Sequence, residues 1–471
     1  MIKTFNSKNI THRNIKLKTL LVSLTIATSL PSVAEIIPKE QVIKDITYLA
    51  SDDLKGRASF SPEIDRAANY IAQRFADIGL KPLKSTSSAS NLLTPSTINS
   101  PVDFTTQPES FLQTFTVNQI HSKTLNVMLN GKKINSDHLA IATTIDELNW
   151  QQGTDNVQTH IVKADDDMRE MLTQLNQSGG KHLVIIASQH AKTFTAYQGY
   201  FKRGLTKLSL EHRGAIVMVL SDENKLNTYT VNASAEITKQ SLTNVVAVLP
   251  GTEKTNEVVL YSSHYDHLGT TEDGKQIFNG ADDDASGTTA ILNLAQYYAN
   301  KGNNRRTLMF SAFTAEEIGG FGSKYFSQQL NPDDVVAMIN IEMIGKPSKF
   351  GAGTVWMTGM ERSNLGALLN EKLVALDREI YQDPYPEQGL FYRSDNATLA
   401  RLGVPAHSFS STQLDKDQHY HQTSDDINSL DLSSMHKVIS SLATATQSLV
   451  DGTVTPTRID KAQVRAKGKI Y

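Results

Sequence analysis

Hydrophobic positions recur along this chain with the period of a helix in some stretches and as unbroken runs in others. Ile291, Leu294, Ala295 and Tyr298 are spaced by three and four residues, and this spacing predicts an amphipathic helix. A second helix is marked by a serine as N-cap, a proline in the first turn and a glycine just past its end. The predicted helices cover residues 43–54, 61–79, 291–298, 365–376 and 435–449.

Three unbroken apolar runs, over residues 258–261, 308–310 and 335–339, indicate strands that are buried on both faces. These runs alternate with the predicted helices, which is typical of an α/β fold with a mostly parallel sheet and helices on both faces. Such sheets bind ligands at the carboxyl ends of their strands. The search for chemistry therefore begins with the residues that follow each run.

The stretch over residues 111–241 has a different pattern and predicts a small mixed α/β domain inserted into the larger one. Asn130-Gly131 suits a tight hairpin turn, short apolar runs follow over 183–186 and 215–220, and a helix is expected over 165–175. The predicted division is a signal peptide over 1–34, a main domain over 35–110 and 242–452, the insertion over 111–241 and a basic tail over 453–471.

The two ends of the chain are basic for different reasons. Five Lys and Arg precede a short apolar run over 20–30 and small residues before Ala34, a pattern typical of a secretory signal cleaved after Ala34. The run is too short for a membrane span, and no later run is longer, so we expect an exported protein, periplasmic or secreted, without a stable span. The tail from Gly452 to Tyr471 is expected to be a frayed, solvated end.

Charge and cysteine content narrow the possible functions. The formal net charge is −3, and cleavage after Ala34 removes five positive charges, so the exported protein is acidic and a poor candidate for binding nucleic acid. The chain has no cysteine, which excludes disulfides, thiol catalysis and thiolate zinc sites. Any metal must be held by His and carboxylate side chains. The oligomeric state is not predicted.

Potential metal ligands follow each predicted buried strand. His264 ends the first strand, Glu317 follows the second and Glu342 the third. An acidic loop over 282–284 leads into a helix, and His421 lies in a polar loop before the last helix. Each group alone could be structural, since acidic residues often cap helix N-termini. Their joint placement at successive strand ends favours a metal site.

These motifs resemble, in order, the co-catalytic two-zinc peptidase family that includes bacterial leucyl-type aminopeptidases and glutamate carboxypeptidase. Segments 393–395 and 403–405 are also similar to that family, and the insertion resembles a protease-associated domain. The resemblance implies a zinc-exopeptidase-like fold that acts on peptide substrates. The motifs are His264-x-Asp266, Gly280-Ala281-Asp282-Asp283, Ala315-Glu316-Glu317-Ile318-Gly319, Glu342-Met343 and Tyr420-His421.

The resemblance also implies a role for each residue in a site with two Zn²⁺ per chain. Relatives commonly have Asp where this chain has Glu342, which leaves the geometry of the first ion open. His419, Asp283 and Asp284 are weighed as competing ligands and not chosen. The implied set is His264 and Glu342 on one ion, Glu317 and His421 on the other, Asp282 bridging both, Asp266 orienting His264, Glu316 as general base for a metal-activated water, and Tyr420 stabilising the oxyanion.

An aminopeptidase is the preferred function, and three alternatives remain. A carboxypeptidase or dipeptidase would need a cationic clamp, for which Arg393 and Arg401 are candidates. A glutaminyl cyclotransferase shares the fold but uses one zinc ion, and a non-catalytic binding protein would have lost ligands. Met343 and Phe391 are guesses for the substrate pocket.

Overall fold

The structure, a computed structural model, describes residues 37–83, 110–153 and 156–471. The predicted signal peptide over 1–34 lies outside these residues, so export stays a prediction. Within the described residues, no helix is long and apolar enough to cross a membrane.

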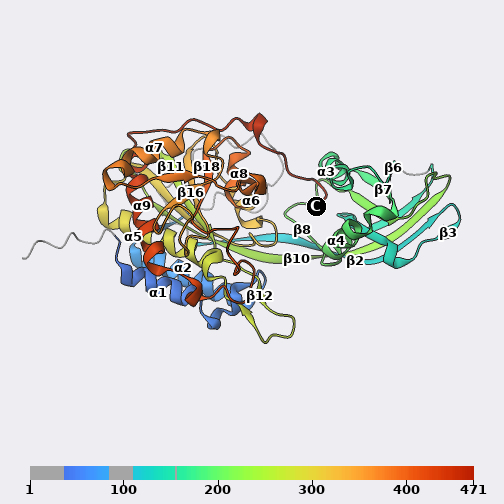
Figure 1. The fold of residues 1–471 in the computed structure, drawn as a ribbon, viewed down its shortest axis with the longest axis horizontal. Helices are drawn as coiled ribbons and strands as arrows, with labels where there is room; N and C mark the ends of the chain where they lie inside the picture. The colour runs from blue at the N-terminus through green and yellow to red at the C-terminus, as the bar shows by residue number, and fades with distance from the viewer. Residues whose placement is uncertain (1–36, 84–109, 154–155) are drawn as a thin grey trace, which may run out of the picture. The chain divides into compact units, whose positions relative to one another are not determined.

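A large mixed sheet forms the centre of the fold, and its middle strands are parallel as the apolar runs predict. Its strand order is β17-β16-β18-β15-β11-β14-β10-β2-β3. Figure 1 labels β16, β18, β11, β10, β2 and β3 of this sheet. The parallel strands are β11 (Lys254–His264), β14 (Arg306–Phe313), β15 (Val335–Ile341) and β18 (Ala406–Ser410). The flanking strands are β2 (Leu112–Leu129), β3 (Lys132–Lys133), β10 (Tyr229–Leu249), β16 (Val355–Met357) and β17 (Ile380–Gln382), and β1 (Lys81–Pro82) pairs with β10.

Helices cover both faces of this sheet, which confirms the predicted α/β class. One apolar core joins the sheet to α1 (Lys39–Leu49), α2 (Pro62–Ile78), α5 (Gly287–Lys301), α7 (Leu365–Leu373), α9 (Leu432–Ala445) and α10 (Gln447–Val450). A second core on the opposite face includes residues of α6 (Phe321–Ser327) and α8 (Asn396–Ala400). Successive side chains of β10 point to opposite faces of the sheet. Val245 and Ala247 therefore pack into the first core, and Val246 and Val248 pack into the second.

Helix α2 shows how local sequence sets an element's limits. Ser61 Oγ accepts a hydrogen bond from the Ile64 N–H, and Pro62 occupies the first turn, where its missing N–H costs nothing. Gly79 ends the helix at φ 86°, a left-handed conformation that glycine adopts readily. The predicted helix and its ends are confirmed.

The inserted region, defined as residues 130–228 between β2 and β10, carries a second sheet of order β4-β9-β7-β6. Asn130 and Gly131 both have positive φ, at 48° and 80°, and form the predicted hairpin turn. β10 runs unbroken through residue 241, where the sequence suggested a boundary. The elements are β4 (Leu139–Thr143), β5 (Glu147–Gln151), β6 (Val157–Val162), α3 (Met168–Ser178), β7 (Lys181–Ile186), α4 (Ala191–Lys202), β8 (Leu205–Lys207) and β9 (Ala215–Leu220).

The basic tail is packed along most of its length, so the expectation of a frayed, solvated end is wrong. Ile459 and Val464 join the second core of the main sheet. Ile470 is fully buried in the core of the inserted region, and its N–H donates to Asn176 Oδ1 over 2.8 Å. Apolar side chains spaced along an otherwise polar segment anchor it to two separate cores.

Candidate metal centre

The site forms where the parallel strands end. His264 is the last residue of β11, Glu317 lies four residues beyond the end of β14, and Glu342 directly follows β15. Three residues in these loops have left-handed backbone conformations: Ala315 at φ 59°, Met343 at φ 54° and His421 at φ 57°. Residues with a β-carbon are sterically strained in the left-handed conformation, so the surrounding packing must hold these turns in place.

Asp283 lies between two histidines. Its Oδ1 is 3.2 Å from His264 Nε2, and its Oδ2 is 3.2 Å from His421 Nε2. His421 Nε2 is also 3.2 Å from Glu317 Oε2. The side chains of His264, Asp283 and Glu317 are at most 7% exposed, whereas His421 is 35% exposed and borders solvent. The cluster is thus an imidazole–carboxylate chain with an open side at His421.

The structure places Asp282, the predicted bridging residue, away from both histidines. Asp282 Oδ1 accepts from the Gly345 N–H over 2.7 Å, and Oδ2 accepts from the Thr412 hydroxyl and lies 3.3 Å from Lys346 Nζ. The carboxylate that lies between the two histidines is that of its neighbour Asp283. The turn over 281–286 rotates successive side chains in different directions, which spacing in the sequence does not reveal.

Asp284, the third carboxylate of this loop, organises backbone. Its Oδ1 accepts from the Gly287 and Met343 N–H groups, and its Oδ2 accepts from the His264 N–H over 3.3 Å. It therefore links the ends of β11 and β15 to the start of α5. Burial raises the pKa of Asp284 well above its usual value.

Asp266 contacts the histidine differently from the expected arrangement. His264 Nδ1 lies 3.1 Å from the Asp266 backbone oxygen and 3.8 Å from its carboxylate. The carboxylate instead accepts from the N–H groups of Glu316 and Glu317 over 3.0 and 3.3 Å, and from the Ser59 hydroxyl. One residue thus fixes both the ring of His264 and the backbone of the loop that carries the two glutamates.

Negative charge dominates the site. Burial would lower the pKa of His264, but Asp283, Glu316 and Asp284 raise it well above its usual value. Burial, with nearby Glu342 contributing, raises the pKa of Glu316 well above the ordinary range. Burial also raises the pKa of Glu342 to about 7. So many buried carboxylates around two imidazoles are expected to attract cations strongly.

The donor set fits divalent zinc. His264 Nε2 and Glu342 Oε2 are buried and have no hydrogen-bond partner among the described residues. Two atoms that bind one tetrahedral zinc ion at ~2.1 Å lie about 3.4 Å apart, close to the 3.2 Å separations around Asp283. Imidazole and carboxylate are ligands that zinc prefers in the absence of thiolates.

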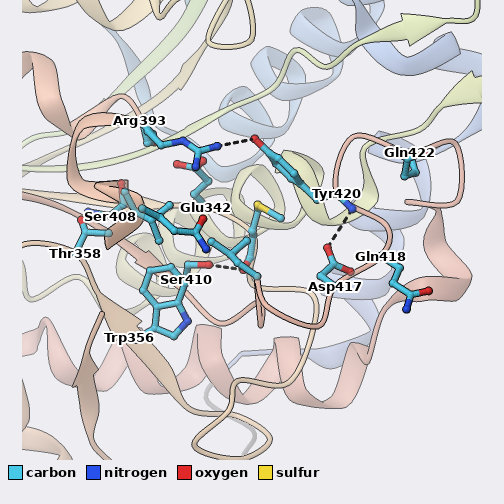
Figure 2. A pocket seen from close by; sticks show the side chains of 15 residues that line it. Glu342, Trp356, Thr358, Arg393, Ser408, Ser410, Asp417, Gln418, Tyr420 and Gln422 are labelled. Atoms are coloured by element: carbon cyan, nitrogen blue, oxygen red, sulfur yellow. Dashed lines mark hydrogen bonds between the residues drawn. The ribbon is translucent and has the colours of Figure 1, made fainter. Parts of the chain in front are cut away.

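A cavity of ≈ 380 Å³ opens beside the cluster, and Glu342 and Tyr420 lie in its wall. Figure 2 shows Arg393 directed at the Tyr420 hydroxyl, to which it donates over 3.4 Å. Met343 lines the cavity as guessed, whereas Phe391 is absent from the lining. The remaining lining residues are Trp356, Thr358, Gln388, Leu390, Ser394, Ser408, Ser410, Leu414, Asp417, Gln418 and Gln422.

Two of the competing candidates lie apart from the cluster. His419 Nδ1 is 3.0 Å from the Ser424 oxygen atoms, so this ring braces its own loop. Arg401 donates to the Ala397 and Arg465 backbone oxygens and does not line the cavity.

Sequence reasoning missed three supporting residues. Asp425 accepts from the N–H groups of Asp282 and Asp283 and so holds the acidic loop. Lys346 donates to Asp417 over 3.0 Å beneath that loop. His267 Nδ1 lies 2.7 Å from Glu317 Oε1. His267 and Asp425 each lie within four residues of a predicted site residue, and that proximity was the available signal.

Similar folds occur among solved aminopeptidases. An aminopeptidase from Aneurinibacillus sp. strain AM-1 superposes with a TM-score of 0.51 at 18% identity, covering 92% of this chain and 97% of that one. The zinc aminopeptidase BSAP from Bacillus subtilis gives a TM-score of 0.51 at 14% identity, covering 92% of this chain and 99% of that one. At these identities the likeness establishes the fold.

Sequence relatives point to the same group. Leucine aminopeptidase 1 of Neurospora crassa is 27% identical over 270 residues, which are 55% of this chain and 65% of the relative. Leucine aminopeptidase 1 of Chaetomium globosum is 30% identical over 191 residues, which are 38% of this chain and 47% of the relative. The chain therefore spans less than two thirds of these relatives. The model of peptidase family M28 matches residues 244–446, which include the whole metal cluster, so this part of the chain is similar to peptidase family M28.

Proposed function

We propose that this protein is a zinc-dependent aminopeptidase that removes N-terminal residues from peptides. The observation that carries the proposal is the chain of 3.2 Å contacts linking His264, Asp283, His421 and Glu317 at the strand ends, beside a cavity of substrate size. Relatives named leucine aminopeptidase support the same activity.

Two zinc ions would share Asp283 as the bridging ligand. His264 and Glu342 would hold one ion, and Glu317 and His421 the other. When bound, zinc polarises a carbonyl group and lowers the pKa of water. Glu342 replaces the commoner aspartate. Its backbone N–H donates to Phe409 O, and its buried Oε2 has no hydrogen-bond partner among the described residues.

Glu316 is the proposed general base. Its backbone is fixed by Asp266, so its side chain has a set position relative to Glu317. It takes a proton from the attacking water and delivers it to the departing amine. Tyr420 accepts a hydrogen bond from Arg393, which leaves its own O–H free to donate to the oxygen that gains negative charge.

The cavity favours substrates with a neutral, apolar side chain. Its one guanidinium, that of Arg393, is directed at Tyr420. Trp356, Leu390 and Leu414 supply apolar surface suited to a side chain such as leucine.

The test is hydrolysis of one leucine-headed peptide in free, N-acetylated and C-amidated forms by zinc-loaded protein. Cleavage that requires the free amine and tolerates the amide supports an aminopeptidase. Cleavage that survives acetylation but requires a free carboxylate would replace the proposal by a carboxypeptidase with Arg393 as its clamp. Release of ammonia from an N-terminal glutamine without peptide cleavage would indicate cyclotransferase chemistry.

A further inference from the structure

His267 is a buried histidine at the metal cluster to which neither the motifs nor the proposed mechanism gives a role. Its side chain is fully buried, and its ring meets that of His421 edge to face, with 5.7 Å between centroids. Nδ1 lies 2.7 Å from Glu317 Oε1 and 3.9 Å from Asp283 Oδ2. The ring therefore faces the second metal position from the side opposite the solvent.

The two oxygens of Glu317 have separate neighbours. Oε2 is 3.2 Å from His421 Nε2, the same separation that joins both histidines to Asp283 and that suits atoms sharing one ion. The 2.7 Å between His267 Nδ1 and Oε1 is shorter, and it is the length of a charge-assisted hydrogen bond. Nε2 of His267 has no hydrogen-bond partner among the described residues, and the other carboxylate oxygen facing Nδ1, Asp283 Oδ2, is farther away at 3.9 Å.

The backbone around His267 holds its ring in place. The His267 N–H donates to the Arg57 backbone oxygen over 3.2 Å. On the other side the ring packs against Gly280, where a β-carbon would stand 2.5 Å from it. The Arg57 guanidinium donates to the carbonyl oxygens of both Asn279 and Gly280, which joins the two supports. A ring confined in this way can orient a partner at little entropic cost.

We propose that His267 is a positioning residue that donates its Nδ1–H to Glu317 Oε1 and thereby presents Oε2 to the second zinc ion. The inference rests on the proposed metal site and deepens it. One ligand atom from each of His267, Asp283 and Glu317 lies within 4.8 Å of the other two, so the test must separate donation by His267 from metal ligation. Loss of such an orienting donor typically weakens metal binding by about 10–100-fold.

Two substitutions separate donation from packing. His267→Leu keeps an apolar side chain of similar bulk and removes the donor, whereas His267→Asn places an amide N–H where Nδ1 stands. His182→Leu in the inserted region is the control, because that histidine is 1% exposed and belongs to the second sheet. The full chain is titrated with Zn²⁺ against a chromophoric chelator, and circular dichroism checks folding.

We expect wild type and His182→Leu to bind two ions, and His267→Leu to lose about 10–100-fold in affinity for one of them. His267→Asn should recover most of that loss, because an amide can donate to Oε1 but is a poor zinc ligand. If His267→Asn is as weak as His267→Leu while both remain folded, or if His267→Leu binds like wild type, the positioning role is overturned.

A second readout does not depend on any variant's folding. In zinc-loaded wild type labelled with ¹⁵N-histidine, Nδ1 of His267 should give the chemical shift of a protonated nitrogen. The shift of a metal-bound nitrogen would make His267 a ligand and overturn the inference. Failure of wild type to bind Zn²⁺ at all would instead refute the proposed function on which the inference rests.

Discussion

At the scale of single residues, three consecutive carboxylates of one chemical type do three different things. Asp282 binds Lys346 and the Thr412 hydroxyl, Asp283 faces two imidazoles, and Asp284 collects backbone N–H groups. Their backbone directions alone distinguish them, because their side chains are identical. Neutralising each should therefore have a different effect.

Asp283→Asn should remove the bridge between the two metal positions. We expect fewer than two bound zinc ions per chain and a loss of at least about 100-fold in kcat, since metal-assisted activation depends on both ions. Metal content by plasma mass spectrometry and steady-state kinetics measure the two effects. Asp282→Asn is the matched control: it should keep both ions but unfold more easily, because Lys346 loses a buried partner. Equal metal contents in the two variants would contradict the assignment.

Glu316→Gln should separate proton transfer from metal binding. The amide cannot accept the water proton, so kcat should fall by about 10²–10⁴-fold while two zinc ions remain bound. Its neighbour Glu317→Gln should instead lose zinc, because Oε2 lies against His421. Kinetics and metal content on the same samples provide the test, and a Glu316→Gln enzyme with wild-type kcat would refute the role of the base.

Residue spacing predicted which loops carry the site, because parallel strands must end at one edge of the sheet. It did not predict which aspartate of 282–284 faces the histidines, since a one-residue choice depends on local turn geometry. The role of Asp266 was predicted in part: it does adjoin His264, but its carboxylate holds the glutamate loop. The direction of each side chain follows from the local backbone conformation, which the spacing of residues in the sequence does not determine.

At the scale of elements, the last segment of the chain shows the limit of periodicity. Ile459, Val464 and Ile470 are buried, yet they are too far apart to form a helical or strand pattern. The intervening polar residues bond to backbone: Lys467 Nζ donates to Gly319 O, near the glutamate loop, over 3.3 Å. Helices such as α2 were predictable because capping and periodicity are local, whereas the tail is fixed by distant partners.

Ile470→Ala should destabilise the protein by about 2–5 kcal/mol, as expected when a fully buried side chain leaves a cavity. Denaturant unfolding followed by tryptophan fluorescence, with Trp150 in the inserted region, measures the change. Val374→Ala is the control, because Val374 is 75% exposed and its truncation should alter stability by less than about 0.5 kcal/mol. Equal effects would show that the tail is not docked in solution.

At the scale of the whole molecule, β2 and β10 belong to the large sheet and pack against the second sheet in one apolar cluster. β10 pairs with β14 over 245–249, with β2 over 229–245 and with β5 over 230–234. The sequence predicted both the parallel sheet and a mixed insertion. It did not predict these shared strands, because each exceeds the usual strand length and crosses the change in sequence pattern.

Replacing residues 118–239 by Asn-Gly should convert the shared strands into a short hairpin, since Val117 and Gln240 are paired neighbours. Ending the same variant after Lys467 removes the residues that dock on the inserted region. We expect two bound zinc ions and hydrolysis of short peptides to persist, because the cluster and cavity lie outside the deleted residues. Loss of both in a folded variant would show that the inserted region completes the site.

The shared strands also bear on how the intact protein melts. The apolar residues of β2 and β10 that pack against the second sheet lose that contact if either sheet unfolds alone, so heat should unfold the two together. A calorimeter would then record one endotherm, in which the van't Hoff enthalpy equals the measured enthalpy. By this feature a chain with two sheets becomes a single cooperative unit.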